Sequence, residues 1–343
     1  MSFYSFKNDY SEGAHEQILK MLIKTNFTQE AGYGNDNFSK IAAEIIQKKI
    51  ENETAMVHFV CGGTQANLIV ISSLLKPYES IIAAETGHIA TSETGAIEST
   101  GHKVNTVATQ DGKLQATDIE NVLAAHTSEH MVKPKAVFIS NSTELGTIYS
   151  LEELTKLSYC CKKNNLYLYL DGARLGSALC SWTNNMTLTD IAALVDVFYI
   201  GGTKNGAFIG EAIVIINDII KENFRFYMKQ RGGLLAKGRL LGIQFIELFK
   251  ETLFFDLATH ANTMAEDLSK GIKKQGYKFL TEPASNQIFP ILPNTLIEKL
   301  KQKYDFYVWC KINNKDSAIR LVTSWATKEE SVKSFLDDMI ILS

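Results

Sequence analysis

The stretch LYLYLDGARLG, residues 166–176, is an apolar run that ends in a charged turn containing glycine. A short run that is apolar on both faces is typical of a strand buried on both sides of a parallel sheet. Similar runs occur at KAVFISNS (135–142), VDVFYIGGTKNG (195–206) and EAIVIIND (211–218). The sequence therefore predicts an α/β fold with a mainly parallel sheet, in which ligands bind at the carboxyl ends of the strands.

Helical patterns lie before and between these runs. SLEELTKLSYCCKKNN (150–165) opens with a capping box formed by Ser150 and Glu153. GAHEQILKMLIKTNF (13–27) and NFSKIAAEIIQKKI (37–50) repeat apolar residues at the spacing of one helix face. Helices that alternate with buried strands would cover the sheet on both faces.

The pattern changes near residue 217. A long helical stretch follows, including RGGLLAKGRLLGIQFIELFKETLFF (231–255). Short strands are then expected around 277–293, 304–312 and 318–324, with a closing helix from about 328. We therefore expect a large domain of residues 1–245 and a smaller C-terminal α+β domain of residues 246–343 that includes the linking helix.

The bulk composition argues against several classes of protein. The 343 residues carry a net charge of −3, which provides no basic surface for nucleic acid. No apolar run approaches the roughly 18 residues of a membrane span, and the N-terminus lacks the pattern of a signal peptide. The five cysteines lack metal-ligand spacing and are interpreted as reduced thiols. We expect a cytoplasmic protein with no metal site and no membrane or nucleic-acid partner.

Two chemical signals fall at predicted strand ends. In FVCGGTQANL, a strand is followed by Gly63, Thr64 and a helix start, which would cradle a phosphate, although a tight glycine turn explains the same residues. In LYLDGARLG, Asp171 ends an apolar strand. A buried carboxylate there needs a cation or a protonated ring nitrogen, unless it forms a structural pair with Arg174.

A third signal is Lys204, the one charged residue in YIGGTKNGAFIG (199–210). A desolvated lysine in a glycine-framed turn can lose its proton and become a nucleophile. A phosphate cradle, a carboxylate and such a lysine are the three groups that pyridoxal phosphate requires from a protein. The sequence therefore predicts a pyridoxal phosphate enzyme in which Lys204 bonds covalently to the cofactor.

The same motifs carry a resemblance. The chain resembles the aspartate-aminotransferase-like (fold type I) pyridoxal phosphate enzymes, and among them the threonine aldolase and β-eliminating lyase family, in particular its low-specificity L-threonine aldolases. The matching segments follow the family's order along nearly the whole chain: FKNDYSEGAHEQIL, AGYGNDNFSKIAAEI, CGGTQANL, ETGHIATSETGA, LDGARLG, GGTKNG and AIRLVTSW. Asn37 stands in the second of these, where proline is common in the family.

The resemblance implies a role for each matching residue at the cofactor. Lys204 would bond to it, Asp171 would pair with the pyridine nitrogen, and His88 would lie over the ring. Gly63 and Thr64 would bind the phosphate, with Thr203 helping beside the lysine, and Arg174 would be a further cofactor-binding residue. Arg231 would bind the phosphate of a partner subunit's cofactor, with Lys237 and Arg239 competing for that role.

The resemblance also implies a substrate site. Arg320 would clamp the substrate carboxylate with Arg174 assisting, a task suited to a planar guanidinium. Asn8 would sit nearby, and Tyr33 would reach the neighbouring subunit's site. Members of the family build their sites across a dimer interface, so we expect a homo-oligomer, either a dimer or a dimer of dimers.

One segment departs from the family pattern. Some members carry a histidine in an ENTHN segment, where this chain reads VFISNSTELG and has Thr143 followed by Glu144. The base for the substrate's β-hydroxyl would then be His88 or an ordered water. Thr143 could still donate a hydrogen bond to that hydroxyl.

The resemblance implies retro-aldol cleavage of L-threonine, L-allo-threonine and other β-hydroxy-α-amino acids to glycine and an aldehyde. A β-eliminating lyase acting on another β-substituted amino acid would need the same cofactor residues and stays open as an alternative. A homologue that has lost catalysis and serves as a binding or regulatory protein is disfavoured because all the cofactor groups are present, and failure to bind the cofactor would favour it. A dinucleotide-dependent dehydrogenase is disfavoured because no GxGxxG follows a first strand.

Overall fold

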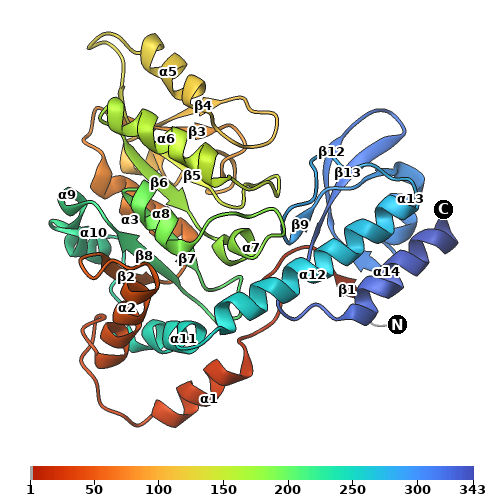
Figure 1. Cartoon of the computed structure of the whole chain (residues 1–343), viewed down its shortest axis with the longest axis horizontal. Coiled ribbons are helices and arrows are strands. Elements are labelled where there is room, and N and C mark those ends of the chain that lie inside the picture. The colour runs from red at the N-terminus through yellow and green to blue at the C-terminus, as the bar shows by residue number, and fades with distance from the viewer. Residues whose placement is uncertain (1–2) are drawn as a thin grey trace.

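The computed structural model describes residues 3–343 and confirms the α/β fold (Figure 1). Within these residues the central sheet has seven strands. Their order across the sheet is β2 (Met56–Val60), β8 (Glu211–Ile215), β7 (Val197–Gly201), β6 (Tyr167–Asp171), β5 (Lys133–Ser140), β3 (Glu79–Ala84) and β4 (Lys103–Val107). Strand β8 runs antiparallel to both of its neighbours, and the other pairs are parallel.

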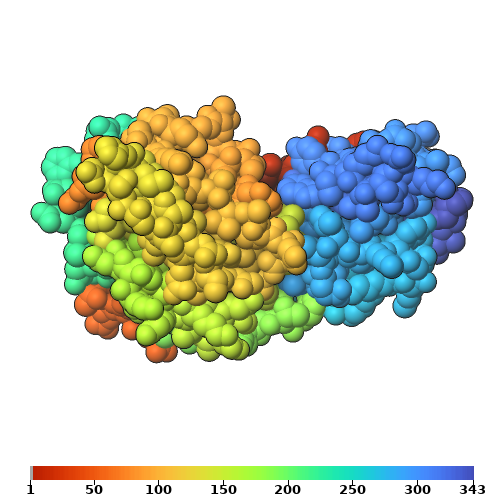
Figure 2. Space-filling model, turned by 90° about the horizontal axis from the view of Figure 1, so that it is seen from above, coloured from red at the N-terminus to blue at the C-terminus, as the bar shows by residue number. Residues whose placement is uncertain are grey.

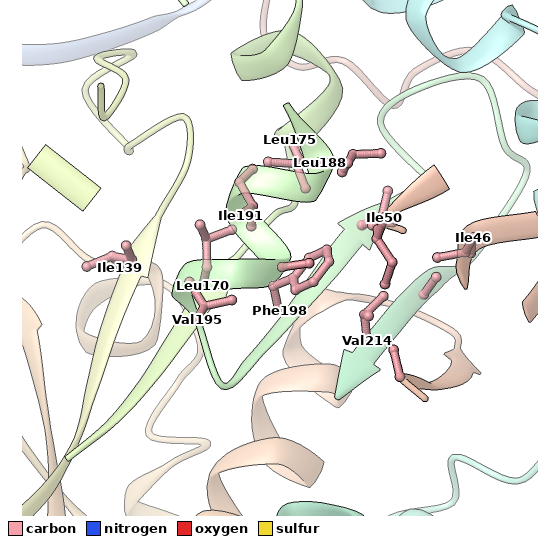
Figure 3. Packing of buried hydrophobic residues seen from close by; sticks show 14 of the residues in the cluster. Ile46, Ile50, Ile139, Leu170, Leu175, Leu188, Ile191, Val195, Phe198 and Val214 are labelled. Atoms are coloured by element: carbon pink, nitrogen blue, oxygen red, sulfur yellow. The ribbon is translucent and has the colours of Figure 1, made fainter. Parts of the chain in front are cut away.

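Alternate residues of the central strands enter two apolar cores, one on each face of the sheet. Ile139, Leu170 and Phe198 belong to the larger core, which is drawn in Figure 3. Phe138 and Tyr169 point to the opposite face and belong to the second core. This alternation is the period of two that strand geometry imposes, and it explains why the runs are apolar on both faces.

Helices cover both faces of the sheet (Figure 1). The larger core is closed by α1 (Glu16–Thr25), α2 (Asn37–Lys49), α5 (Ala116–Ala125), α6 (Leu151–Lys163), α7 (Leu175–Leu179), α8 (Leu188–Leu194) and α11 (Arg239–Phe249). The second core is closed by α3 (Gly63–Leu74), α4 (His88–Thr91) and α10 (Phe224–Gln230), with the short elements η1 (Glu98–Thr100) and α9 (Asp218–Lys221) beside them. The capping box predicted at Ser150 and Glu153 is confirmed at the start of α6.

The first two predicted helices are confirmed, but their apolar faces are only partly covered. Ile18 and Ile46 are fully buried, as expected for core residues. Leu19 and Ile41 are more than a third exposed, and Ile23 is 76% exposed. Within one chain, the outer side of α1 therefore presents apolar side chains to solvent.

The long helical stretch predicted around residues 231–255 is interrupted in the structure. Residues 231–238 form a turn in which Gly232 has a φ of 71°, a conformation that favours glycine. Helix α11 begins only at Arg239, and helix α12 (Leu253–Lys274) follows after a second break. None of the helices in residues 3–343 has the length and apolar character that crossing a bilayer would require.

Helix α12 runs from the large part of the molecule to the small one (Figure 1). Its first half packs in the larger core through Phe254 and Leu257, and its second half packs in a third core through Met264 and Leu268. The division of the chain at residue 245 stays a prediction, because this helix contributes to the cores on both sides of it.

The C-terminal part is a small α+β unit, as expected. Its sheet has the order β10 (Ile291–Pro293), β13 (Asp316–Val322) and β12 (Tyr307–Lys311), with β9 (Gln287–Ile288) also paired to β13, and its helices are α13 (Asn294–Leu300) and α14 (Glu329–Leu342). Strand β1 (Tyr4–Ser5) pairs with β11 (Tyr304–Asp305) of this unit. The N-terminal segment, red in Figure 2, is visible at the junction of the two parts. This crossing brings residues 8–10 toward the carboxyl ends of the large sheet.

Candidate active site

A cavity of about 300 Å³ lies at the carboxyl ends of β5, β6 and β7. The register of the strands determines which residues form the floor of this cavity. Ser140 pairs with Asp171 at the ends of β5 and β6, and Gly201, at the end of β7, pairs with Glu211 at the start of β8. Eight of the residues proposed from the sequence line this one cavity: Gly63, Thr64, His88, Thr143, Asp171, Arg174, Thr203 and Lys204.

The start of helix α3 forms one wall of the cavity. Its N-cap residue Gly62 is extended and offers no side chain to the free N–H groups of the first turn. A Cβ added at Gly63 would lie 2.8 Å from the Tyr199 hydroxyl, so this position has room only for glycine. Free N–H groups at the positive end of a helix dipole, beside the exposed Thr64, form a site suited to a phosphate.

Asp171 lies on the cavity floor and is only 4% exposed. Its Oδ1 accepts hydrogen bonds from the Tyr199 hydroxyl at 2.5 Å and from the Ala173 backbone N–H at 3.0 Å, and Asn67 Nδ2 lies 3.4 Å from its Oδ2. No Lys, Arg or His among residues 3–343 forms an ion pair with this carboxylate, since Arg174 is paired elsewhere. The geometry leaves Asp171 able to bind a protonated ring nitrogen.

Lys204 reaches the same cavity from the turn after β7. Burial lowers the pKa of its amine, and the neighbouring Arg174 acts in the same direction. Within residues 3–343 its Nζ makes no hydrogen bond and no salt bridge. Glu211 faces it from β8 and accepts a hydrogen bond from the Gly202 N–H at 3.0 Å, and burial raises the pKa of Glu211 to about 8. A lysine in these surroundings loses its proton more readily and becomes a better nucleophile.

His88 stands at the start of α4, on another wall of the cavity. Its Nδ1 lies 2.8 Å from Oε1 of Glu93, which is 6% exposed and is also bound by Asn67 at 2.7 Å. The hydrogen bond with Glu93 raises the pKa of His88, and the charge of Asp171 adds to the shift. The imidazole is therefore oriented by a buried carboxylate that stands behind it.

Two arginines approach the cavity from the side of the small domain. Arg174 binds the buried Asp9 through two hydrogen bonds of 2.7 and 3.0 Å, and Asn286 supports Asp9 at 2.9 Å. Although burial opposes it, Arg174 together with Lys204 holds the pKa of Asp9 below its usual value. Arg320 lies over the rings of Tyr307 and Trp309, and its buried Nε has no partner within residues 3–343. Two guanidinium groups with free donors form a site suited to a carboxylate.

Four residues proposed from the sequence do not line the cavity within one chain: Arg320, described above, and Asn8, Tyr33 and Arg231. Asn8 closes a turn through its Oδ1, which accepts hydrogen bonds from the Tyr10 N–H and the Ser11 hydroxyl. Tyr33 is 46% exposed and lines a separate cavity. Arg231 ends α10, and its carbonyl accepts a hydrogen bond from Gln65, one residue beyond Thr64, while its buried Nε has no partner within residues 3–343.

The two competitors of Arg231 lie elsewhere as well. Lys237 and Arg239 line another cavity beside α1, and Arg239 donates hydrogen bonds to the backbone carbonyls of Thr25 and Thr28. Thr203 lines the active cavity, but its hydroxyl bonds to the backbone of Gly210. Thr143 is fully buried, and its hydroxyl lies 2.7 Å from that of Thr147.

Several residues of the site were not found from the sequence. Asp9 pairs with Arg174 across 165 residues of chain, so the Asp171–Arg174 pair considered from the sequence is not formed. Tyr199 and Glu93 had a local signal, because each lies inside a motif already singled out, five residues from Lys204 or from His88. Glu211 had no such local signal in the sequence, since an acidic residue at the start of a strand is common.

Known proteins resemble the chain over its whole length. It is 32% identical over 338 residues to a low specificity L-threonine aldolase of a Pseudomonas species, a match that covers 97% of this chain and 96% of the relative. A structure of Leishmania major threonine aldolase matches with a TM-score of 0.98 and 51% identity, and covers 99% of both chains. An aspartate aminotransferase from Thermus thermophilus, at 16% identity, matches with a TM-score of 0.72 over 99% of this chain and 92% of that one and shares the fold.

The profile of the family described as β-eliminating lyase matches residues 8–294. That range includes the α3 cradle, His88, Asp171 and Lys204, which are the groups gathered around the cavity. On this match and on the whole-length similarity to its threonine aldolases, the chain belongs to the β-eliminating lyase family.

Proposed function

We propose that this protein is a pyridoxal phosphate-dependent L-threonine aldolase. It cleaves the Cα–Cβ bond of L-threonine, L-allo-threonine and related β-hydroxy-α-amino acids, and it releases glycine and an aldehyde. The observation that carries the proposal is the convergence of Lys204, Asp171 and the α3 cradle on one cavity. The two whole-length relatives named threonine aldolase support the choice of reaction.

The residues present fit the cofactor. Enzymes of this family and fold depend on pyridoxal phosphate. Here the free N–H groups in the first turn of α3, which starts at Gly63, would bind its phosphate, because no capping side chain occupies them. Asp171 would hold a proton on the ring nitrogen, and Lys204 would attach the cofactor through its amine.

When bound, the cofactor would supply an electron sink that lets a bond to the substrate Cα break. The remaining chemistry falls to the chain. Asp171 is held in place on the cavity floor by the hydrogen bonds that its Oδ1 accepts from Tyr199 and Ala173. His88, held by Glu93, stands where it can pack on a bound ring.

The choice of bond depends on how the substrate is oriented. Arg320 and Arg174 would bind its carboxylate, and the Asp9–Asn286 support keeps Arg174 from turning away. With the carboxylate fixed by these two guanidinium groups, the bonds at the substrate Cα would take one orientation in the cavity, and that orientation would decide which of them can break. The methyl group of threonine contributes little to discrimination, since one methylene is worth about 1–3 kcal/mol.

We further propose a homo-oligomer whose sites are shared between subunits. The outer side of α1 and the turn after it expose Ile23 at 76% and Phe27 at 95%, and Phe208 is exposed at 61%. Such side chains favour a protein partner over water. Tyr33 would then complete the cavity of a neighbouring subunit, and Arg231 would assist at a phosphate.

The test is product analysis with the purified protein loaded with pyridoxal phosphate. The proposal expects acetaldehyde and glycine in equal amounts from L-threonine or L-allo-threonine. A loaded protein that releases no acetaldehyde but converts another β-substituted amino acid would make it a β-eliminating lyase. A protein that binds no cofactor would exclude both activities.

A further inference from the structure

Glu144 has one carboxylate oxygen bound and the other free. Its Oε1 accepts hydrogen bonds from the His88 backbone N–H at 2.9 Å and from the Ser140 hydroxyl at 2.7 Å. Its Oε2 accepts none from residues 3–343, and the side chain lines the active cavity. The two bonds to Oε1 fix the carboxyl group at the cavity wall and leave Oε2 without a partner among residues 3–343.

The other candidates for taking a proton from the substrate are less suited. Thr143, its neighbour in the chain, is fully buried, and its hydroxyl is 2.7 Å from that of Thr147. His88 binds Glu93 through Nδ1 at 2.8 Å and is expected to pack on the cofactor ring. Lys204 is needed for cofactor attachment. Glu144 is thus a carboxylate on the cavity wall that has no other assigned task.

We propose that Glu144 is the catalytic base that accepts the proton of the substrate's β-hydroxyl through Oε2. The proposal rests on the proposed aldolase function. In the cleavage step the O–H bond breaks and its proton passes to Oε2. The O–H electron pair forms the new C=O bond of the aldehyde, and the Cα–Cβ electron pair stays with the glycine fragment. In the reverse reaction the same carboxylic acid returns the proton to the aldehyde oxygen.

The environment of Glu144 suits this task. Burial raises the pKa of this carboxyl group, and the charge of Asp171 adds to the shift, whereas the hydrogen bond from Ser140 opposes it. A carboxylate with a raised pKa is a stronger base while it is ionised. Arg174 lines the same cavity as Glu144, so the carboxyl group of Glu144 shares that cavity with the place where the substrate carboxylate is expected.

The test compares Glu144→Gln with the wild-type enzyme in two reactions. Glutamine keeps an oxygen that can accept the hydrogen bonds from His88 and Ser140, so the local fold is retained. The first reaction is cleavage of L-threonine. The second is exchange of the α-proton of glycine with deuterated water, followed by NMR, which needs the cofactor and Lys204 but involves no β-hydroxyl.

We expect Glu144→Gln to lower kcat for cleavage about 10²–10³-fold and to leave glycine exchange within about threefold of wild type. The wild-type kcat should rise with pH through the pKa of Glu144, and this acidic limb should be absent from the variant. Infrared difference spectra should show a carboxylic acid band that titrates with the same midpoint in the wild type and is missing in the variant.

Glu79→Gln is the matched control, because Glu79 is a buried glutamate at the opposite end of the sheet, where it binds the Lys76 N–H. It should leave both reactions unchanged. The proposal would be overturned if Glu144→Gln cleaved L-threonine at the wild-type rate, or if the pH profile of its kcat kept the acidic limb of the wild type. Equal loss of cleavage and exchange would also overturn it and would assign Glu144 to positioning His88. If the wild type exchanges glycine but cleaves no β-hydroxy amino acid, the proposed function fails instead.

Discussion

The middles and the carboxyl ends of the same three strands differ sharply. Three residues before the carboxyl ends of β5, β6 and β7, Val137, Leu168 and Phe198 are at most 1% exposed and belong to the larger apolar core, part of which is drawn in Figure 3. At the ends, Asp171 accepts hydrogen bonds but has no cationic partner within residues 3–343, and Lys204 Nζ makes no hydrogen bond or salt bridge there. The strand middles therefore supply stability, and the ends hold groups that a ligand is needed to satisfy.

The contrast has a cost in free energy. A buried polar group that lacks a partner destabilises the fold, whereas a buried apolar side chain stabilises it by roughly 1.5–3 kcal/mol. The larger core thus supports a site that folding alone would not favour. Substitutions at the ends should change activity with little loss of stability, and substitutions in the middles should do the reverse.

Lys204→Ala should have the largest effect. Removing the amine removes the cofactor's attachment, and kcat should fall roughly 10⁴-fold or more. Because a desolvated amine is also removed, the urea midpoint should stay at or above that of the wild type. Steady-state kinetics and urea unfolding check both parts. An active Lys204→Ala protein would contradict the claim that the strand ends hold the groups needed for activity.

Phe198→Ala tests the claim that the apolar residues within the strands supply stability. Phe198 is fully buried, and its truncation leaves a cavity that should cost about 3–5 kcal/mol of unfolding free energy. The turnover per folded molecule should stay near that of the wild type, because the side chain points away from the cavity into the larger core. Urea unfolding measures the loss of stability. A large fall in turnover per folded molecule would show that substitutions in the core also disturb the active site.

Asp171→Asn should lower kcat by about 10²–10³-fold, because a neutral amide cannot stabilise positive charge on the ring nitrogen. Tyr199→Phe is its graded control. It removes one hydrogen bond to the carboxylate and should cost about 1.5–3 kcal/mol of that stabilisation. The absorbance spectrum of the loaded protein, followed with pH, separates a changed ring charge from simple loss of cofactor. An unchanged spectrum and kcat in Asp171→Asn would contradict the role.

His58 is an exception to this contrast, because it is a titratable side chain that lies within strand β2 and not at a strand end. It stacks on Phe224, and its buried Nε2 has no partner within residues 3–343. Burial lowers its pKa from 6.5 to about 4, with Arg225 adding to the shift. The unfolded chain therefore takes up the proton first, and stability is present above pH 6.5 and lost as the pH falls toward 4.

The loss through His58 should reach about 3 kcal/mol between these two pH values. Urea unfolding at pH 7 and pH 5, compared between the wild type and His58→Phe, isolates this contribution from that of the carboxylates. The variant should lose less stability on acidification. Equal losses in both proteins would show that His58 does not resist protonation.

The fold was predictable to the extent that it follows from local pattern. The apolar runs and the capping box at Ser150 were enough to place the strands and helix α6, because buried strands are apolar on both faces. The direction of β8 was not predictable, since an apolar run looks the same in either direction. The break at 231–238 was also missed, although Gly232 and Gly238 mark its two ends.

The candidate site was predictable where its residues lie in short motifs at strand ends. Lys204 and Asp171 were found in this way, whereas His88 was implied by the family resemblance, and all three line one cavity. The pairing of Arg174 with Asp9 was not predictable, because it joins segments 165 residues apart through the crossing of the N-terminus. The orientation of Glu144 depends on a hydrogen bond from Ser140 at the end of β5 and on one from His88, 56 residues away, and no local pattern reveals the second.

The most direct test of the account is to locate the cofactor on the chain. The protein is loaded with pyridoxal phosphate, reduced with borohydride to fix any C=N bond to a lysine, digested and analysed by mass spectrometry. The account predicts one modified peptide, carrying the cofactor on Lys204. Attachment to a different lysine, or no attachment at all, would contradict the claim that the strand ends form a pyridoxal phosphate site.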